Sequence, residues 1–210
     1  MPIVQTVAPA AEPITRAEAK LHLRLDDDLT ADDALIDTLI SAARAYAEAY
    51  CGRSFITQQW RLVLDTFPSP QSFGVPWGQP WSIPPQAIQL ERGPVQSVES
   101  VRYLDMGGVL QTMPAGQYTV DLASPMPRIT PIFGAIWPIS LPQIGAVQVN
   151  YTTGYGAAAS NVPAGIRQWL LLRVATLYRN REEVAVLGRG SVAALPFVDT
   201  LLDPYRVIQG

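Results

Sequence analysis

The sequence predicts an α+β fold in which N- and C-terminal helices pack as a small helical bundle with an inserted antiparallel β subdomain. Apolar residues recur at helical spacing near both ends of the chain and alternate in its middle. The chain has 15 Gly and 19 Pro, which separate the short alternating segments as turns do. The expected boundaries are 14–53 plus 163–206 for the helical core, 54–162 for the β subdomain and 1–13 for an N-terminal lead.

Two helices are expected before residue 54. Thr15-x-x-Glu18 has the spacing of a capping box, which predicts a short helix over about 16–24. Thr30-x-x-Asp33 resembles a second box and precedes the clearest amphipathic stripe of the chain, over about 31–50. Gly52 is the expected end of that helix, because glycine is favoured just past a helix C-terminus.

The middle of the chain is expected to form short antiparallel strands. In 56–65 every second residue is apolar or aromatic apart from Gln58, which indicates a half-buried strand. The Pro/Trp-rich loop 68–85 follows, and Asp105-Met106-Gly107-Gly108 predicts a hairpin turn further on. The remaining expected strands are 87–91, 98–104, 108–113, 117–121, 128–131 and 146–152.

The C-terminal region predicts one long helix and one short one. Pro163 is expected to begin a helix that runs to about Arg181, because proline is favourable in the first turn. A Gly-rich loop, 188–191, separates it from a short helix over 196–202 that Pro204 ends. A helix of two turns is unstable alone in water, so it must dock on another surface.

Composition excludes several classes of protein. With 210 residues, 48% of them hydrophobic, the chain can bury a core, which a disordered chain cannot. Cys51 and His22 are the only cysteine and histidine, so neither a disulfide framework nor a multi-cysteine or multi-histidine metal site is expected. The sequence shows no apolar run long enough for a membrane span and no signal peptide, so we expect either a soluble intracellular product or a particle component assembled inside a cell.

The residues that could bind a metal ion or act in catalysis have simpler structural explanations. Asp26–Asp37 has some calcium-loop spacing, but Ala31 stands where the loop needs glycine, so we interpret these carboxylates as helix caps. A thiol at a helix C-terminus has a raised pKa, which argues against a Cys51–His22 dyad. We therefore expect no catalytic, cofactor-binding or metal-ligating residue, and no enzyme activity.

Charge is unevenly distributed along the chain. The chain has 33 charged residues, 15 basic and 18 acidic, and only seven of them fall within 66–166. Interface cores are depleted of charge and rich in aromatic residues, so this region is expected to face other protein. A neutral surface rich in Gln, Ser and Thr is the alternative. Trp77 and Trp81 are the expected contact residues of the 68–85 loop, unless that loop folds back on its own sheet.

Several blocks, taken in order, resemble phage head–tail connector (adaptor, or head-completion) proteins, a family that also occurs in gene transfer agents. The resemblance is strong over 13–65 and 145–206 and looser over 66–144. The residues that carry it are Pro13–Leu25, Asp33–Ile36, Ala47–Arg53, Thr57–Trp60, Val95–Val98, Val162–Gln168 and Leu201–Arg206.

The resemblance implies a structural virion protein at the head–tail junction of a phage or phage-like particle, assembled in the cytoplasm of the host bacterium. Such proteins form a ring, usually of twelve copies, beneath the portal protein. The ring extends the DNA channel without binding DNA specifically, and it provides the platform for a stopper or tail-completion protein. No cofactor and no membrane are implied.

The resemblance also implies that the C-terminal region contacts the portal. The expected residues are Leu201, Leu202, Tyr205 and Arg206, although the same segment could pack on its own subunit. Two other functions stay open from the residues alone. One is a β binding module for sugar or peptide lined by Trp77, Trp81 and Trp137, and the other is an uncharacterised enzyme that uses carboxylates.

Overall fold

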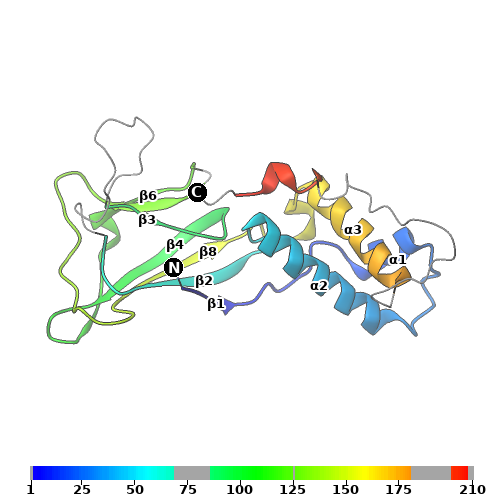
Figure 1. The fold of residues 1–210 in the computed structure, drawn as a ribbon, viewed down its shortest axis with the longest axis horizontal. Coiled ribbons are helices and arrows are strands. Elements are labelled where there is room, and N and C mark those ends of the chain that lie inside the picture. The colour runs from blue at the N-terminus through cyan, green and yellow to red at the C-terminus, as the bar shows by residue number, and fades with distance from the viewer. Residues whose placement is uncertain (1, 69–85, 125, 181–199, 208–210) are drawn as a thin grey trace, which may run out of the picture. The chain divides into compact units, whose positions relative to one another are not determined.

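The computed structural model describes residues 2–68, 86–124, 126–180 and 200–207 (Figure 1). Trp77, Trp81 and most of the helix expected over 196–202 therefore lie outside the described residues. The chain divides into two compact units, which we treat separately. Residues 9–56 and 155–210 form the helical unit, and residues 1–8 and 57–154 form the β unit. None of the described helices is long and apolar enough to cross a membrane.

The helical unit joins the two ends of the chain around one core. It contains α1 (Arg16–Leu23), α2 (Asp33–Cys51) and α3 (Ala164–Arg179), with short 3-10 turns at Ala159–Asn161 and Asp203–Tyr205. Ile36 and Ile40 of α2 pack with Ile166 and Trp169 of α3, and all four side chains are almost fully buried. The expected helical bundle of N- and C-terminal segments is therefore confirmed.

The helix ends follow the sequence signals in two cases out of three. The Thr15 hydroxyl accepts from the Glu18 amide at 3.1 Å and the Glu18 carboxylate accepts from the Thr15 amide at 2.8 Å, as the capping box predicts. Gly52 ends α2 with a positive φ of 65°. The second box, at Thr30, is wrong: Asp32 precedes the helix with no side-chain cap, because the Asp33 carboxylate is bound by Lys20 and Arg16 instead.

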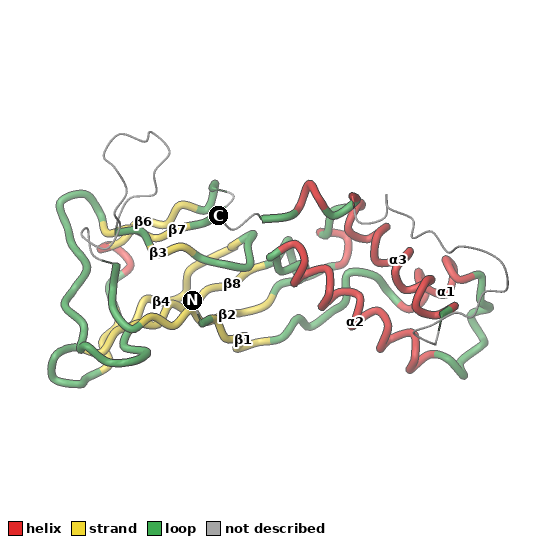
Figure 2. The backbone as a smooth tube through the Cα atoms, viewed as in Figure 1, coloured by secondary structure: helices red, strands yellow, loops and turns green. Residues whose placement is uncertain are grey.

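The β unit consists of two antiparallel sheets that enclose a common core (Figure 2). The larger sheet has the order β1 (Ile3–Val7), β2 (Gln58–Leu64), β8 (Val147–Thr153), β4 (Val95–Leu104), β5 (Leu110–Thr112). The smaller sheet has the order β3 (Ile88–Gln89), β7 (Arg128–Pro131), β6 (Tyr118–Asp121). The α+β class with an inserted antiparallel β subdomain is confirmed. The buried side chains come from both sheets and include Leu62, Val101, Val149, Ile88 and Ile129.

The first residues of the chain belong to this sheet. Residues 1–13 were expected to be only a lead into the first helix, but Ile3–Val7 pairs with β2 as an antiparallel edge strand, with Ile3 opposite Leu62. The strand is short and four of its five residues are exposed, so it lacks the alternation of burial that would reveal it. The β unit is thus completed by a segment that precedes the helices in the chain.

The hairpin turn between β4 and β5 forms as expected. The Asp105 carboxylate accepts from the amides of Gly107 and Val109 at 2.9 and 3.0 Å. A hydrogen bond from Gln111 and these amides lower the pKa of Asp105. Gly108 has a φ of 78°, which explains why glycine occupies this position.

Candidate interaction surfaces

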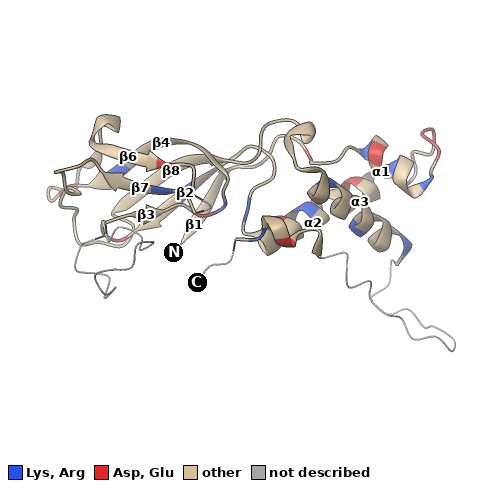
Figure 3. Cartoon of the chain, turned by 90° about the horizontal axis from the view of Figure 1, so that it is seen from above, with Lys and Arg blue, Asp and Glu red and all other residues tan. Residues whose placement is uncertain are grey.

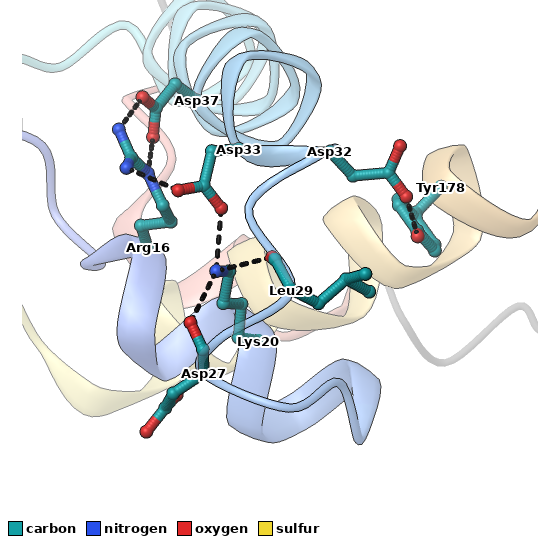
Figure 4. A network of polar contacts seen from close by, with 8 residues as sticks. All are labelled: Arg16, Lys20, Asp27, Leu29, Asp32, Asp33, Asp37 and Tyr178. Atoms are coloured by element: carbon teal, nitrogen blue, oxygen red, sulfur yellow. Dashed lines mark hydrogen bonds and ion pairs between the residues drawn. The ribbon is translucent and has the colours of Figure 1, made fainter.

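A network of charged side chains holds the loop between α1 and α2 (Figure 4). The Lys20 ammonium is almost fully buried and lies 2.7 Å from the Asp33 carboxylate. It also donates to the backbone carbonyls of Leu29 at 2.8 Å and Asp27 at 3.2 Å. Lysine is rarely buried unless its ammonium group has partners. Two of the partners here are backbone carbonyls, so Lys20 holds the backbone of the loop in place. The three carboxylates of Asp26–Asp28 remain on exposed residues.

Arg16 completes this network from the first turn of α1. Its guanidinium pairs with Asp33 at 2.9 Å and with both carboxylate oxygens of Asp37. The hydrogen bond from Lys20 lowers the pKa of Asp33, and the hydrogen bond from Arg16 lowers that of Asp37. At the end of the same helix pair, the Tyr178 hydroxyl of α3 donates to Asp32. These carboxylates are used as structural partners, and the described residues contain no group of three or more His, Cys, Asp or Glu arranged for a metal ion.

The C-terminal segment docks on the helical unit of its own chain. Leu202 is fully buried in the helical core, and the Val207 amide donates to the Cys51 carbonyl at 2.9 Å. The Arg53 guanidinium donates to the Tyr205 carbonyl, and a β-carbon placed on Gly165 would lie only 3.2 Å from the Tyr205 hydroxyl. The structure therefore shows contacts within the subunit for this segment.

These contacts bear on the four C-terminal residues expected to meet the portal. Leu202 uses its side chain inside its own subunit, while Leu201 and Tyr205 are half-buried and Arg206 is exposed. Helical conformation is described at Thr200 and stops before Pro204, which lies within the 3-10 turn Asp203–Tyr205. Contact of these residues with a partner stays a prediction.

Docking of this segment also explains the state of Cys51. The thiol lies in the last turn of α2, and burial raises its pKa to about 11. A thiol with this pKa is almost entirely protonated at neutral pH, so it is a poor nucleophile.

One end of the β unit presents a largely apolar surface. The loop from β7 to β8 and the β4–β5 hairpin meet there, joined by a hydrogen bond from the Leu141 amide to the Leu104 carbonyl at 2.9 Å. Large side chains on both segments are exposed, and Phe133 is exposed completely. We call these residues the apolar end. They are Met106, Val109, Phe133, Ile136, Ile139 and Ile144.

The loop that carries the apolar end is held in place at several points. The Ala135 amide donates to the Ile132 carbonyl at 3.0 Å and Gly134 has a φ of 81°, as in a type II turn that places Phe133 at its tip. Trp137 stacks on Phe67 with ring centroids 4.9 Å apart and donates through Nε1 to the Gln86 carbonyl at 2.7 Å. Phe133 is thus presented by an ordered turn.

Trp137 does not line an aromatic groove. It is almost fully buried in the β-unit core, so the predicted sugar- or peptide-binding role for this residue is wrong. The apolar end itself was not identified from the sequence, although it lies in the charge-poor region that predicted partner contacts. Composition indicated that this region meets other protein, but it could not tell exposed side chains from buried ones.

The comparisons with known proteins point to one kind of protein. Residues 14–102 match the sequence family described as phage gp6-like head-tail connector protein. A solved structure titled "Virion of native gene transfer agent (GTA) particle" matches with a TM-score of 0.77 and 28% identity, covering 100% of this chain and 97% of that chain. These comparisons support a structural role for the chain as a head–tail connector.

Two further solved structures are similar to the chain over its whole length. "Neck of empty GTA particle computed with C6 symmetry" matches with a TM-score of 0.76 and 27% identity. "Neck of native GTA particle computed with C12 symmetry" matches with a TM-score of 0.71 and 26% identity. Both matches cover 100% of this chain and 97% of the other chain, so the β unit is included in the likeness. No curated protein sequence matches the chain.

Proposed function

We propose that the connector forms a ring of twelve copies beneath the portal protein, at the head–tail junction of a phage-like particle. The ring extends the DNA channel and provides the platform to which a stopper or tail-completion protein binds. The observation that carries this proposal is the full-length likeness to chains of gene transfer agent particles, including a neck computed with C12 symmetry. The particle assembles in the cytoplasm of the host bacterium.

Surface chemistry supports a structural role of this kind. A ring subunit needs two different faces for its neighbours and further faces for the components above and below it. The apolar end of the β unit suits a lasting protein contact, because so many large apolar side chains are rarely left in water on a monomer. This surface accounts for the charge-poor middle of the chain without invoking a catalytic site.

Net charge supports passage of DNA without adhesion. The chain has a formal net charge of −3, so twelve copies carry about −36. Such a ring does not attract phosphate groups through its total charge, and DNA is expected to slide through it without specific binding.

Particles made without this connector test the proposal. We expect heads that package DNA but carry no tail and no ring beneath the portal, and we expect the wild-type gene supplied in trans to restore tails. Tailed particles of normal yield from the deletion strain would contradict the proposal. Empty, unexpanded heads would assign the chain an earlier role than the one proposed.

The two tryptophans of the 68–85 loop offer a finer test. Trp77→Ser with Trp81→Ser is expected to lower the yield of tailed particles while the melting temperature of the isolated chain stays nearly unchanged. A large fall in melting temperature would show that these side chains pack within their own subunit.

A further inference from the structure

The helical unit has two exposed patches with complementary chemistry. α2 buries one face, with Ile36, Ile40, Ala43, Ala47 and Cys51, as an amphipathic helix does. Its opposite face is exposed but also lacks charge over the last three turns. The exposed residues of that stripe are Thr38, Ala42, Ala45, Tyr46 and Ala49.

Arginines border this second stripe of α2. The Tyr46 ring stacks on Tyr50, with centroids 6.4 Å apart, and on the buried Trp169, at 5.8 Å. The Arg173 guanidinium lies over Tyr46 at 5.5 Å, and that of Arg206 lies over Tyr50 at 5.0 Å. Within the described parts of the chain, neither guanidinium forms an ion pair with a carboxylate.

This combination of residues is typical of a protein interface. Small residues let another backbone approach closely, and Tyr, Trp and Arg are the types that contribute most to interface energy. We call this surface the receiving face. Its members are Ala42, Ala45, Tyr46, Ala49, Arg173 and Arg206.

The second patch surrounds the loop between α1 and α2. Asp26, Asp27 and Asp28 are exposed, and no ion pair satisfies their carboxylates within the described parts of the chain. Exposed apolar side chains flank them, with Leu21 79% and Leu29 42% exposed. The Lys20 ammonium donates hydrogen bonds to the carbonyls of Asp27 and Leu29, which fixes the backbone of this patch. We call Leu21, Asp26–Asp28 and Leu29 the acidic edge.

The two patches lie at different ends of α2. The acidic edge precedes Asp33, while the receiving face reaches Ala49, and the 13 residues from Asp33 to Tyr46 span roughly 20 Å of helix. Figure 3 shows the acidic loop between α1 and α2 in red, at the end of the helical unit where α2 begins. A chain with two complementary patches at separate places forms a heterologous contact, which closes into a ring when the rotation allows it.

We propose that the acidic edge of one copy docks on the receiving face of the next copy in the ring. Asp26–Asp28 would face Arg173 and Arg206, and Leu21 and Leu29 would cover the Ala/Tyr stripe of α2. The inference rests on the proposed ring and names the surfaces that build it. A second copy is the occupant because the chain itself supplies the matching charge and the matching apolar side chains.

Cysteine cross-linking of the full-length chain tests this contact, and the buried native Cys51 does not interfere. Ala45→Cys lies on the receiving face and Asp28→Cys on the acidic edge. Under mild oxidation, a mixture of the two single variants is expected to give disulfide-linked dimers, while each variant alone stays monomeric. The variant with both changes is expected to give a ladder of oligomers. Ala34→Cys, exposed on α2 but outside the receiving face, is the matched control and should not cross-link with Asp28→Cys.

Charge reversal tests the recognition itself. Arg173→Glu in the Ala45→Cys chain is expected to lower the yield of mixed dimers roughly tenfold. For the chains that keep Arg173, 500 mM salt should also lower the yield, because salt screens the attraction between the two patches. Replacing Asp26 and Asp27 by Arg in the Asp28→Cys chain should restore the yield lost through Arg173→Glu in the Ala45→Cys chain.

Three results would overturn the proposed contact. Dimers of the Ala45→Cys variant alone would show a symmetric contact, and an absence of mixed dimers would show that the two patches do not meet. A loss of binding to a short DNA duplex on Arg173→Glu, with cross-linking unchanged, would assign the receiving face to DNA. If particles still contain the ring in any of these cases, the proposed function stands and only the surfaces are wrong.

Discussion

The helical unit and the β unit use their charged side chains in different ways. In the helical unit carboxylates pair with cations from distant parts of the chain, as Asp33 does with Lys20 and Glu12 does with Arg44. In the β unit, Asp65 and Asp105 instead accept hydrogen bonds from backbone amides of nearby loops. Most of the described ion pairs thus lie in the helical unit. In the β unit one ion pair, Asp121–Arg128, joins β6 to β7, and the other two acids shape turns that present apolar side chains.

This difference indicates which kind of contact each unit can make with a partner. The helical unit retains unpaired charge on its surface, so its contacts gain specificity from electrostatics. The apolar end of the β unit gains its contact energy from removal of apolar area from water. Substitutions in the two units should therefore differ in their dependence on salt and pH.

The largest expected effect tests whether the C-terminal segment belongs to the helical core. Leu202→Ala should lower the free energy of unfolding by about 2–5 kcal/mol, because the side chain is fully buried and its loss leaves a cavity. Urea unfolding followed by circular dichroism measures this. Leu110→Ala, on an exposed β5 residue, is the control and should change stability by less than about 0.5 kcal/mol. Equal effects of the two substitutions would mean that the segment does not dock in solution.

A smaller effect is expected when the buried cation of the helical unit is removed. Lys20→Met should cost about 1–3 kcal/mol, because the carbonyls of Asp27 and Leu29 lose their donor. Amide hydrogen exchange should accelerate in the 24–32 loop and stay unchanged in the β unit. Arg24→Met, at an exposed neighbouring position, is the control. Unchanged exchange in the loop would contradict the role given to Lys20.

In the β unit the corresponding weak point is a turn. Gly134→Val should cost about 1–2 kcal/mol, because a β-branched residue is strained at a φ of 81° while open space surrounds the position. Thermal unfolding measures the loss, and Gly116→Val, where φ is not in the left-handed region and no atom lies near, is the control. If both variants melt alike, the turn does not constrain Phe133.

Much of this fold could be predicted from the sequence, because local signals and tertiary structure agree. The Thr15 box, Gly52 and the alternation in 56–65 each specify a local geometry that the structure keeps. The second box failed at Thr30 because Asp33 is drawn to Lys20, a tertiary partner that spacing along the chain does not reveal. The exposure of Phe133 could not be predicted either, because the sequence alone does not distinguish an apolar residue in a core from one at the tip of a turn.

The smallest expected effect is a gradual loss of stability in acid. Hydrogen bonds and ion pairs lower the pKa of Asp33 and Asp37 from an ordinary value of 3.8. Burial raises the pKa of Glu18, but the hydrogen bonds with Thr15 and the ion pair with Arg167 outweigh it, so this pKa is lowered from 4.5. Groups with a lowered pKa stabilise the folded state above these ordinary values, so stability should fall as pH drops below about 4.5. The helical signal at 222 nm measures this, and Asp37→Asn should flatten the pH dependence. A pH profile unchanged by that substitution would contradict the pairing with Arg16.

The central claim is that this connector forms a ring at the head–tail junction, and a cryo-electron microscopy reconstruction of the neck of the native particle tests it most directly. The account predicts twelve copies in one ring beneath the portal, with both the helical unit and the β unit of each copy visible in the density. Isolated copies of the chain elsewhere in the particle, or a neck without this chain, would contradict it.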